Sequence, residues 1–135
     1  MPKAMKIGYD ALIEAARREI TELEPEQVMA AMDGGGIVII DVRDIREIER
    51  EGRIPGSFHC PRGMLEFWID PGSPYFKPVF GEQKRFVFHC ALDWRSALST
   101  QTAQRMGLEN VAHMKGGFKA WRDADGPVEM VAAEA

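Results

Sequence analysis

The feature that most constrains this chain is a change of pattern at Cys90. The segment Arg85–His89 has the length and composition of a buried strand, and Ser96–Met106 carries apolar residues at helical spacing. A strand that turns directly into a helix directs backbone N–H groups and the positive end of the helix dipole at the turn. Such a setting favours a cysteine thiolate, and Arg95 adds a permanent positive charge. Cys90 is therefore the candidate nucleophile.

Other strand-like segments alternate with helical ones along the chain. The strands are predicted at Ile37–Ile40, Ser57–His59 and Val111–Met114. The further helices are predicted at Tyr9–Ile20, Glu24–Met32, Ile45–Glu51, Met64–Ile69 and Phe118–Arg122. This alternation predicts an α/β fold with a central parallel sheet flanked by helices on both faces. Ligands of such sheets bind at the carboxyl ends of the strands, which is where Cys90 lies.

Length and charge limit the classes of function. A chain of 135 residues is one domain of ordinary size. Its net charge of −4 and isoelectric point near 5.4 give no footprint for nucleic acid or an anionic membrane. The two cysteines, Cys60 and Cys90, fit free thiols in a reducing compartment. The first residues lack the apolar core of a signal peptide, so a cytoplasmic location is expected.

Four motifs resemble those of one family, and they occur in the same order along the chain. Cys90 is followed by four residues and then Arg95-Ser96, which resembles the active-site loop of the rhodanese sulfurtransferases. The other matching segments are Asp41-Val42-Arg43, Gly52–Ser57 and Lys115–Trp121. The resemblance covers about Thr21–Gly126. It implies a rhodanese-like domain at 21–128, preceded by an amphipathic helical extension at 1–20 and followed by a tail at 129–135. The chain beyond Gly126 shows no pattern and is expected to fray.

The resemblance also implies a chemistry. The Cys90 thiolate attacks the outer sulfur of a donor, a persulfide forms on Cys90, and an acceptor removes the sulfur. The donor would be a small sulfur-containing anion such as thiosulfate, or a persulfide; the acceptor would be a thiol, possibly on a protein, or a cyanide-like nucleophile. Backbone amides would cradle the persulfide and Arg95 would hold an anionic donor. The implied substrate-binding residues are Ala91, Leu92, Asp93, Trp94, Arg95 and Ser96. No metal or organic cofactor is implied.

Asp93 departs from the family, whose loops often have glycine at this position. A turn position that suits glycine favours a positive φ, which aspartate tolerates better than most residues. Its carboxylate would repel doubly charged thiosulfate. One hypothesis is that thiosulfate is a poor donor and that a less charged persulfide or a protein-bound sulfur is used. The alternative is that Asp93 points to solvent and changes little.

Two other functions compete with sulfur transfer. Phosphatases and arsenate reductases of related architecture also use a cysteine-arginine loop, but they place one residue more between cysteine and arginine than the four found here. That longer loop gives a wider cradle for a tetrahedral oxyanion. The second competitor is a non-enzymatic rhodanese-like module that only binds a partner or carries sulfur. Assay of the purified protein separates this module from an enzyme.

Several other residues have a structural and a functional interpretation. In the family, the positions of Asp41 and Arg43 hold the fold around the active-site loop. The alternative for these two residues is a direct contact with substrate. Glu47 is a candidate ion partner of Arg43, and Asp44 is a candidate N-cap. The N-terminal helix either packs on the outside of the domain or docks a partner.

The two His-Cys pairs, His59-Cys60 and His89-Cys90, invite a metal site. Adjacent side chains on a strand point to opposite faces, which argues against shared ligation. Cys60 is instead expected to be buried, and His89 to orient hydrogen bonds or fill space. The aromatic segment 61–81 either adds a satellite of core or forms an apolar wall beside Cys90 that selects the acceptor.

Overall fold

Parallel strands form the sheet at the centre of the computed structural model, which describes residues 2–132. Their order across the sheet is β1-β5-β4-β2-β3, and every neighbouring pair is parallel. The strands are β1 (Glu22–Leu23), β2 (Ile37–Asp41), β3 (Phe58–His59), β4 (Arg85–His89) and β5 (Val111–Met114). The predicted parallel sheet is confirmed, and β4 lies at its centre.

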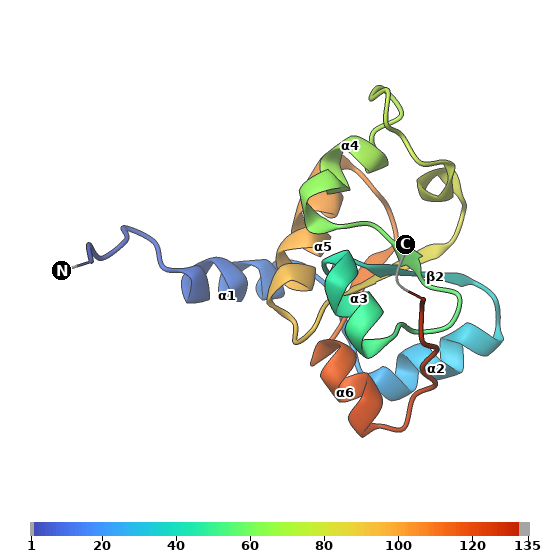
Figure 1. The fold of residues 1–135 in the computed structure, drawn as a ribbon. Coiled ribbons are helices and arrows are strands. Elements are labelled where there is room, and N and C mark those ends of the chain that lie inside the picture. The colour runs from blue at the N-terminus through green and yellow to red at the C-terminus, as the bar shows by residue number, and fades with distance from the viewer. Residues whose placement is uncertain (1, 133–135) are drawn as a thin grey trace.

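Helices cover both faces of the sheet, as predicted (Figure 1). The helices α4 (Leu65–Ile69) and α5 (Trp94–Met106) pack on one face, and α2 (Pro25–Asp33) and α6 (Gly117–Asp123) pack on the other. Successive residues of β4 point to opposite faces. Phe86 and Phe88 join the cluster under α4 and α5, and Val87 joins the cluster under α2 and α6. A strand buried on both faces therefore delivers Cys90.

Two further helices lie at the margins of the sheet. The helix α3 (Ile45–Glu51) follows β2, and the Asp44 carboxylate caps it by accepting a hydrogen bond from the N–H of Arg46 at 2.8 Å. The helix α1 (Tyr9–Glu19) packs on α5 through Ile13 and Ala16, and the chain before it extends away from the body (Figure 1). No helix within residues 2–132 is both long enough and apolar enough to cross a bilayer.

The segment 61–81 belongs to the core. Leu65, Ile69 and Phe80 are buried in the same cluster as Phe86 and Phe88. The ring centroids of Phe80 and Phe86 lie 5.6 Å apart. Besides the predicted short helix, the segment contains two 3₁₀ turns, at Arg62–Met64 and Pro78–Gly81. Core packing accounts for Trp68, Phe76 and Phe80, whereas Phe67 and Tyr75 are exposed, and no residue of the segment lines the pocket at Cys90.

The chain after Gly126 differs from the sequence prediction. Arg53 and Glu129 exchange two backbone hydrogen bonds of 2.9 Å, and their side chains form an ion pair of 2.6 Å. The indole N–H of Trp121 donates to the carbonyl of Pro127 at 2.8 Å. The prediction that everything beyond Gly126 frays is therefore wrong as far as Glu129, because these contacts hold the segment against the domain.

A buried ion pair closes the carboxyl end of β2. The guanidinium of Arg43 donates to the Asp41 carboxylate at 2.8 Å, and the two side chains are 0% and 1% exposed. Arg43 also donates to the carbonyl of Gly52 at 2.8 Å and lies over the Phe118 ring, with Cζ 4.1 Å from its centroid. Burial opposes the charged form of Asp41, but the nearby His89 and the hydrogen-bonded Arg43 hold the pKa of this carboxyl below its usual range. The pair thus ties β2, the α3–β3 connection and α6 together.

We expect Arg43→Leu to lower the free energy of unfolding by about 3–5 kcal/mol, because it leaves the Asp41 charge buried without its partner. Urea unfolding monitored by circular dichroism measures this loss. The control is the double variant Asp41→Asn, Arg43→Leu, which removes both charges and should lose less than Arg43→Leu alone. A single variant as stable as the parent would show that the pair does not hold the fold.

Candidate active site

Cys90 lies between the end of β4 and the start of α5. Its side chain is 1% exposed, and the N–H of Ser96, in the first turn of α5, donates to Sγ at 3.3 Å. The helix begins at Trp94, two residues earlier than the sequence pattern predicts. The sulfur therefore faces the amino end of a helix of 13 residues, where backbone N–H groups and the helix dipole stabilise negative charge.

The first turn of α6 holds the loop from its other side. The N–H of Phe118 donates to the carbonyl of Cys90 at 2.8 Å. The N–H of Lys119 donates to the carbonyl of Ala91 at 3.2 Å. Gly117, at φ +64°, brings this backbone so close that a Cβ would overlap the loop carbonyls. Because N–H and C=O of a trans peptide point in opposite directions, the N–H groups of Ala91 and Leu92 point away from α6.

Arg95 binds a carboxylate of the neighbouring helix. Its guanidinium donates to Glu47 of α3 in a bidentate pair, at 2.7 and 2.9 Å. These hydrogen bonds raise the pKa of Arg95 and lower the pKa of Glu47. The expected Glu47–Arg43 pair is wrong, because the Arg43 side chain turns into the protein toward Asp41. The positive charge beside Cys90 is thus largely neutralised in this structure.

Asp93 differs from the sequence expectation in its backbone conformation, and its side chain has a partner in the protein. Its φ is −159°, so it does not adopt the positive φ that a glycine-suited position favours. Its carboxylate accepts a hydrogen bond from the N–H of Gly116 at 3.2 Å, so the side chain does not simply point to solvent. Asp93 therefore fastens the loop to the turn before α6 while keeping its negative charge near Cys90.

A buried polar chain behind the loop was missed by sequence reasoning. The hydroxyl of Ser96 lies 2.9 Å from Nδ1 of His113, and Nε2 of His113 lies 2.9 Å from the Glu22 carboxylate. Burial lowers the pKa of His113 against the opposing effect of Glu22. Because a carboxylate only accepts, Nε2 carries a hydrogen, and in the neutral form of the ring Nδ1 accepts from the Ser96 hydroxyl. The signal available in the sequence was a histidine within the otherwise apolar β5.

Cys60 and His89 lie close to the loop but are closed to solvent. Burial raises the pKa of the Cys60 thiol to about 12, so Cys60 is a poor nucleophile. His89 stacks on Phe118 with ring centroids 6.2 Å apart, and its Nε2 lies 3.5 Å from the Asp41 carboxylate. Burial lowers the pKa of His89, and the Asp41 carboxylate opposes this shift. Among residues 2–132, no cluster of three His, Cys, Asp or Glu side chains is arranged to hold a metal ion.

A pocket of about 260 Å³ opens at the loop. Its lining is mostly apolar and comes from the loop itself: Cys90, Ala91, Leu92, Trp94 and Arg95. Leu92 and Trp94 are each 50% exposed. The structure thus brings the predicted residues together around one sulfur, but it directs the Ser96 hydroxyl toward His113 and the Asp93 carboxylate toward Gly116.

The chain matches a known family over most of its length. The model of the rhodanese-like domain matches residues 24–124. A thiosulfate sulfurtransferase, GlpE, from Glaesserella parasuis is 27% identical over 110 residues, which cover 82% of this chain and 94% of that protein. The mouse thiosulfate sulfurtransferase/rhodanese-like domain-containing protein 3 is 30% identical over 100 residues, which cover 70% of this chain and 64% of the mouse protein. This chain thus accounts for less than two thirds of the mouse relative.

A solved structure resembles the whole chain. It is a protein of unknown function, and possible tyrosine phosphatase, from Rhodopseudomonas palustris. The two chains are 56% identical, with a TM-score of 0.92 over 96% of this chain and 99% of that chain. The similarity therefore extends over α1, which precedes the family match.

We expect Gly117→Ala to disturb both the fold and the loop, because the new methyl group would overlap the carbonyl oxygen of Leu92. Gly35→Ala is the matched control, since Gly35 has φ +72° but no atom within 4 Å of an added Cβ. In the control, the free energy of unfolding should fall only by the cost of an alanine in the left-handed conformation, about 1–2 kcal/mol. Gly117→Ala should lower the free energy of unfolding by more than this and should change the rate of Cys90 alkylation by iodoacetamide. Equal stability and equal alkylation rates in the two variants would contradict this role.

Proposed function

Because this chain belongs to the rhodanese-like domain family, we propose that it is a sulfurtransferase that carries sulfane sulfur on Cys90. The observation that carries the proposal is the position of Sγ, at the amino end of α5 and 3.3 Å from the N–H of Ser96. A persulfide is an anion, so N–H donors and a helix dipole directed at the sulfur stabilise it. Cys60, with its pKa near 12, lacks this setting.

The reaction would proceed in two nucleophilic displacements at sulfur. In the first, the Cys90 thiolate forms an S–S bond with the outer sulfur of the donor, and the donor's own bond to that sulfur breaks. Thiosulfate leaves as sulfite, and a persulfide donor leaves as its thiolate. In the second, an acceptor thiolate takes the outer sulfur and restores the Cys90 thiolate. Both steps start from an existing thiolate, so neither needs a separate general base.

The charges around Cys90 support a donor of low charge. Glu47 compensates the guanidinium of Arg95 at 2.7 Å, and the Asp93 carboxylate lies in the same loop. A carboxylate about 6 Å from a dianion costs about 1 kcal/mol in well-solvated surroundings, and more where water is excluded. We therefore propose a persulfide, on a small molecule or on a protein, as the preferred donor, and thiosulfate as a poor one.

Phosphate transfer is the competing enzymatic function, since one close relative is described as a possible tyrosine phosphatase. The loop here has four residues between Cys90 and Arg95, which makes a narrower cradle than the longer phosphatase loop. A phosphoryl group also needs a guanidinium for its oxygens, and Arg95 is committed to Glu47. Both observations favour sulfur transfer. A non-enzymatic carrier module is the remaining alternative.

Turnover of two cysteine variants tests the proposal. We expect Cys90→Ser to abolish sulfur transfer from a persulfide donor to cyanide without loss of fold, because it removes the nucleophile. Cys60→Ser is the matched control and should keep most of the activity. Thiocyanate formation measures transfer, and circular dichroism checks the fold. The assignment fails if a folded Cys60→Ser protein loses as much activity as Cys90→Ser, and an inactive parent protein would favour the carrier module.

The charges of Glu47 and Asp93 predict the behaviour of two neutral variants. Glu47→Gln frees the Arg95 charge and retains a side chain that can accept from the N–H of Asp44 at the start of α3. Asp93→Asn removes the opposing charge and keeps an acceptor for Gly116. Each should lower the KM for thiosulfate by about threefold to tenfold, most strongly at low ionic strength. The KM for a singly charged persulfide should change less. Unchanged thiosulfate values in both variants at low salt would reject the argument.

A further inference from the structure

A second cavity lies next to the Cys90 pocket, between α1 and the active-site loop. Its volume is about 400 Å³, within the range of small-molecule sites. We call it the α1 groove; its lining residues are Tyr9, Asp10, Ile13, Glu14, Arg17, Arg18 and Trp94. Trp94 lines both this groove and the pocket of Cys90. Trp94 therefore joins the α1 groove to the pocket that Cys90 lines.

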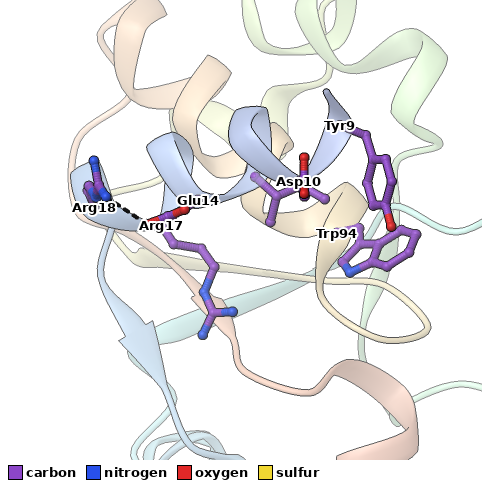
Figure 2. A pocket seen from close by; sticks show the side chains of 7 residues that line it. Tyr9, Asp10, Glu14, Arg17, Arg18 and Trp94 are labelled. Atoms are coloured by element: carbon purple, nitrogen blue, oxygen red, sulfur yellow. Dashed lines mark hydrogen bonds and ion pairs between the residues drawn. The ribbon is translucent and has the colours of Figure 1, made fainter. Parts of the chain in front are cut away.

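The end of the α1 groove nearest the loop is aromatic. The rings of Tyr9 and Trp94 lie 4.9 Å apart, at an interplanar angle of 46° (Figure 2). They remain 62% and 50% exposed, so both rings leave apolar surface for contact with a ligand. Ile13, which is 8% exposed, forms part of the floor. This end offers an apolar contact to a ligand that reaches toward Cys90.

The rest of the α1 groove carries both signs of charge. Asp10 and Glu14 contribute carboxylates, and Arg17 and Arg18 contribute guanidiniums, with Arg18 at the end opposite the aromatic pair (Figure 2). Glu14 and Arg18 pair at 2.6 Å, but their side chains are 67% and 75% exposed. Exposed pairs of this kind contribute little stability, so a ligand can replace either partner cheaply. Arg17 is tied to Glu22 at 3.1 Å and is less free to respond.

This combination selects a class of ligand. The four charges sum to zero, so a small anion such as thiosulfate gains little net attraction. A molecule with an ammonium and a carboxylate gains at both ends, and an apolar stem fits against the aromatic pair. We propose that the α1 groove binds a zwitterionic, peptide-like thiol, with its ammonium toward Asp10 and Glu14, its carboxylate toward Arg18, and its sulfur beside Trp94 at Cys90.

The inference rests on the proposed sulfur transfer and gives it a substrate class. The same ligand enters as a thiol acceptor or, carrying an extra sulfur, as a persulfide donor. As acceptor, its thiolate forms a bond with the outer sulfur of the Cys90 persulfide while the Cys90 S–S bond breaks. The products are the ligand persulfide and the Cys90 thiolate, with no net oxidation. The α1 helix thus belongs to the substrate site even though the family match begins at residue 24.

The acceptor arm of the test uses one turnover of the full chain. Protein loaded with sulfur on Cys90 is mixed with glutathione, 2-mercaptoethanol or cyanide, and mass spectrometry follows the loss of the added sulfur. We expect Tyr9→Ala and Arg18→Gln each to raise the half-saturating glutathione concentration about fivefold. Discharge by 2-mercaptoethanol and cyanide should stay within about twofold of the parent, because these acceptors are too small to span the groove. Leu12→Ala is the control, since Leu12 is an exposed residue of α1 outside the groove.

The donor arm repeats the comparison with glutathione persulfide and with thiosulfate as the sulfur source. If Tyr9→Ala slows the loading of Cys90 from glutathione persulfide but not from thiosulfate, the result supports the inference for donors. If loading slows equally from both sources, the result overturns it. Equal acceptor kinetics in Tyr9→Ala, Leu12→Ala and the parent also overturn it while leaving sulfur transfer intact. Failure of cyanide to discharge any variant would instead count against the proposed function.

A binding measurement keeps the inference testable without turnover. S-methylglutathione carries the same charges but has no reactive thiol. Its titration should change the tryptophan fluorescence of the parent and of Leu12→Ala with similar Kd values. Tyr9→Ala should bind it about fivefold more weakly. No saturable signal in the parent, or equal Kd values in all three proteins, would overturn the α1 groove as a site for this ligand.

Discussion

The contact between two backbone turns is the constraint on which the rest of the site depends. The carbonyls of Cys90 and Ala91 accept hydrogen bonds from the first turn of α6, at 2.8 and 3.2 Å. A peptide group fixed by its carbonyl also fixes the direction of its N–H. The loop therefore keeps this conformation only while the first turn of α6 stays close, which requires the absence of a side chain at Gly117.

Buried charges support that contact from below. The Asp41–Arg43 pair lies at the carboxyl end of β2, and the Phe118 ring contacts both the Arg43 guanidinium, with Cζ 4.1 Å from the ring centroid, and the His89 ring. Behind α5, the Ser96 hydroxyl is held by His113, which lies 2.9 Å away. These groups are closed to solvent, so we assign them to positioning rather than to contact with substrate. They give an irregular loop the rigidity that a transient thiolate and persulfide require.

Much of the fold could be predicted from the sequence, and the reasons are local. The apolar runs at 37–40 and 85–89 have the composition of strands covered on both faces. Glycine-rich turns mark the ends of the helices and strands next to them. The strand β1 was missed because its two residues, Glu22 and Leu23, carry no periodicity and pair only with β5. The ordering of residues 127–129 was missed for a similar reason, since it depends on Arg53, which is distant in sequence.

The side chains of the site were harder to predict than its backbone. Spacing suggested that Glu47 pairs with Arg43, four residues earlier, but Arg43 precedes the helix and turns inward, and Glu47 instead meets Arg95, 48 residues away. The positive φ expected for Asp93 came from the family's preference for glycine at this position, and this loop does not adopt it. The Ser96–His113–Glu22 chain joins three elements with no sequence signal in common. Ion pairs and buried networks of this kind depend on tertiary contacts that no local pattern records.

The central claim is that Cys90 is the residue that receives sulfur, and peptide-resolved mass spectrometry tests it most directly. The full chain is treated with a low-molecular-weight persulfide and, separately, with thiosulfate, then digested under conditions that preserve persulfides. The account predicts one added sulfur atom on the Cys90 peptide, more from the persulfide than from thiosulfate, and none on the Cys60 peptide. An unmodified Cys90 peptide under both treatments, or equal addition to the Cys60 peptide, would contradict it.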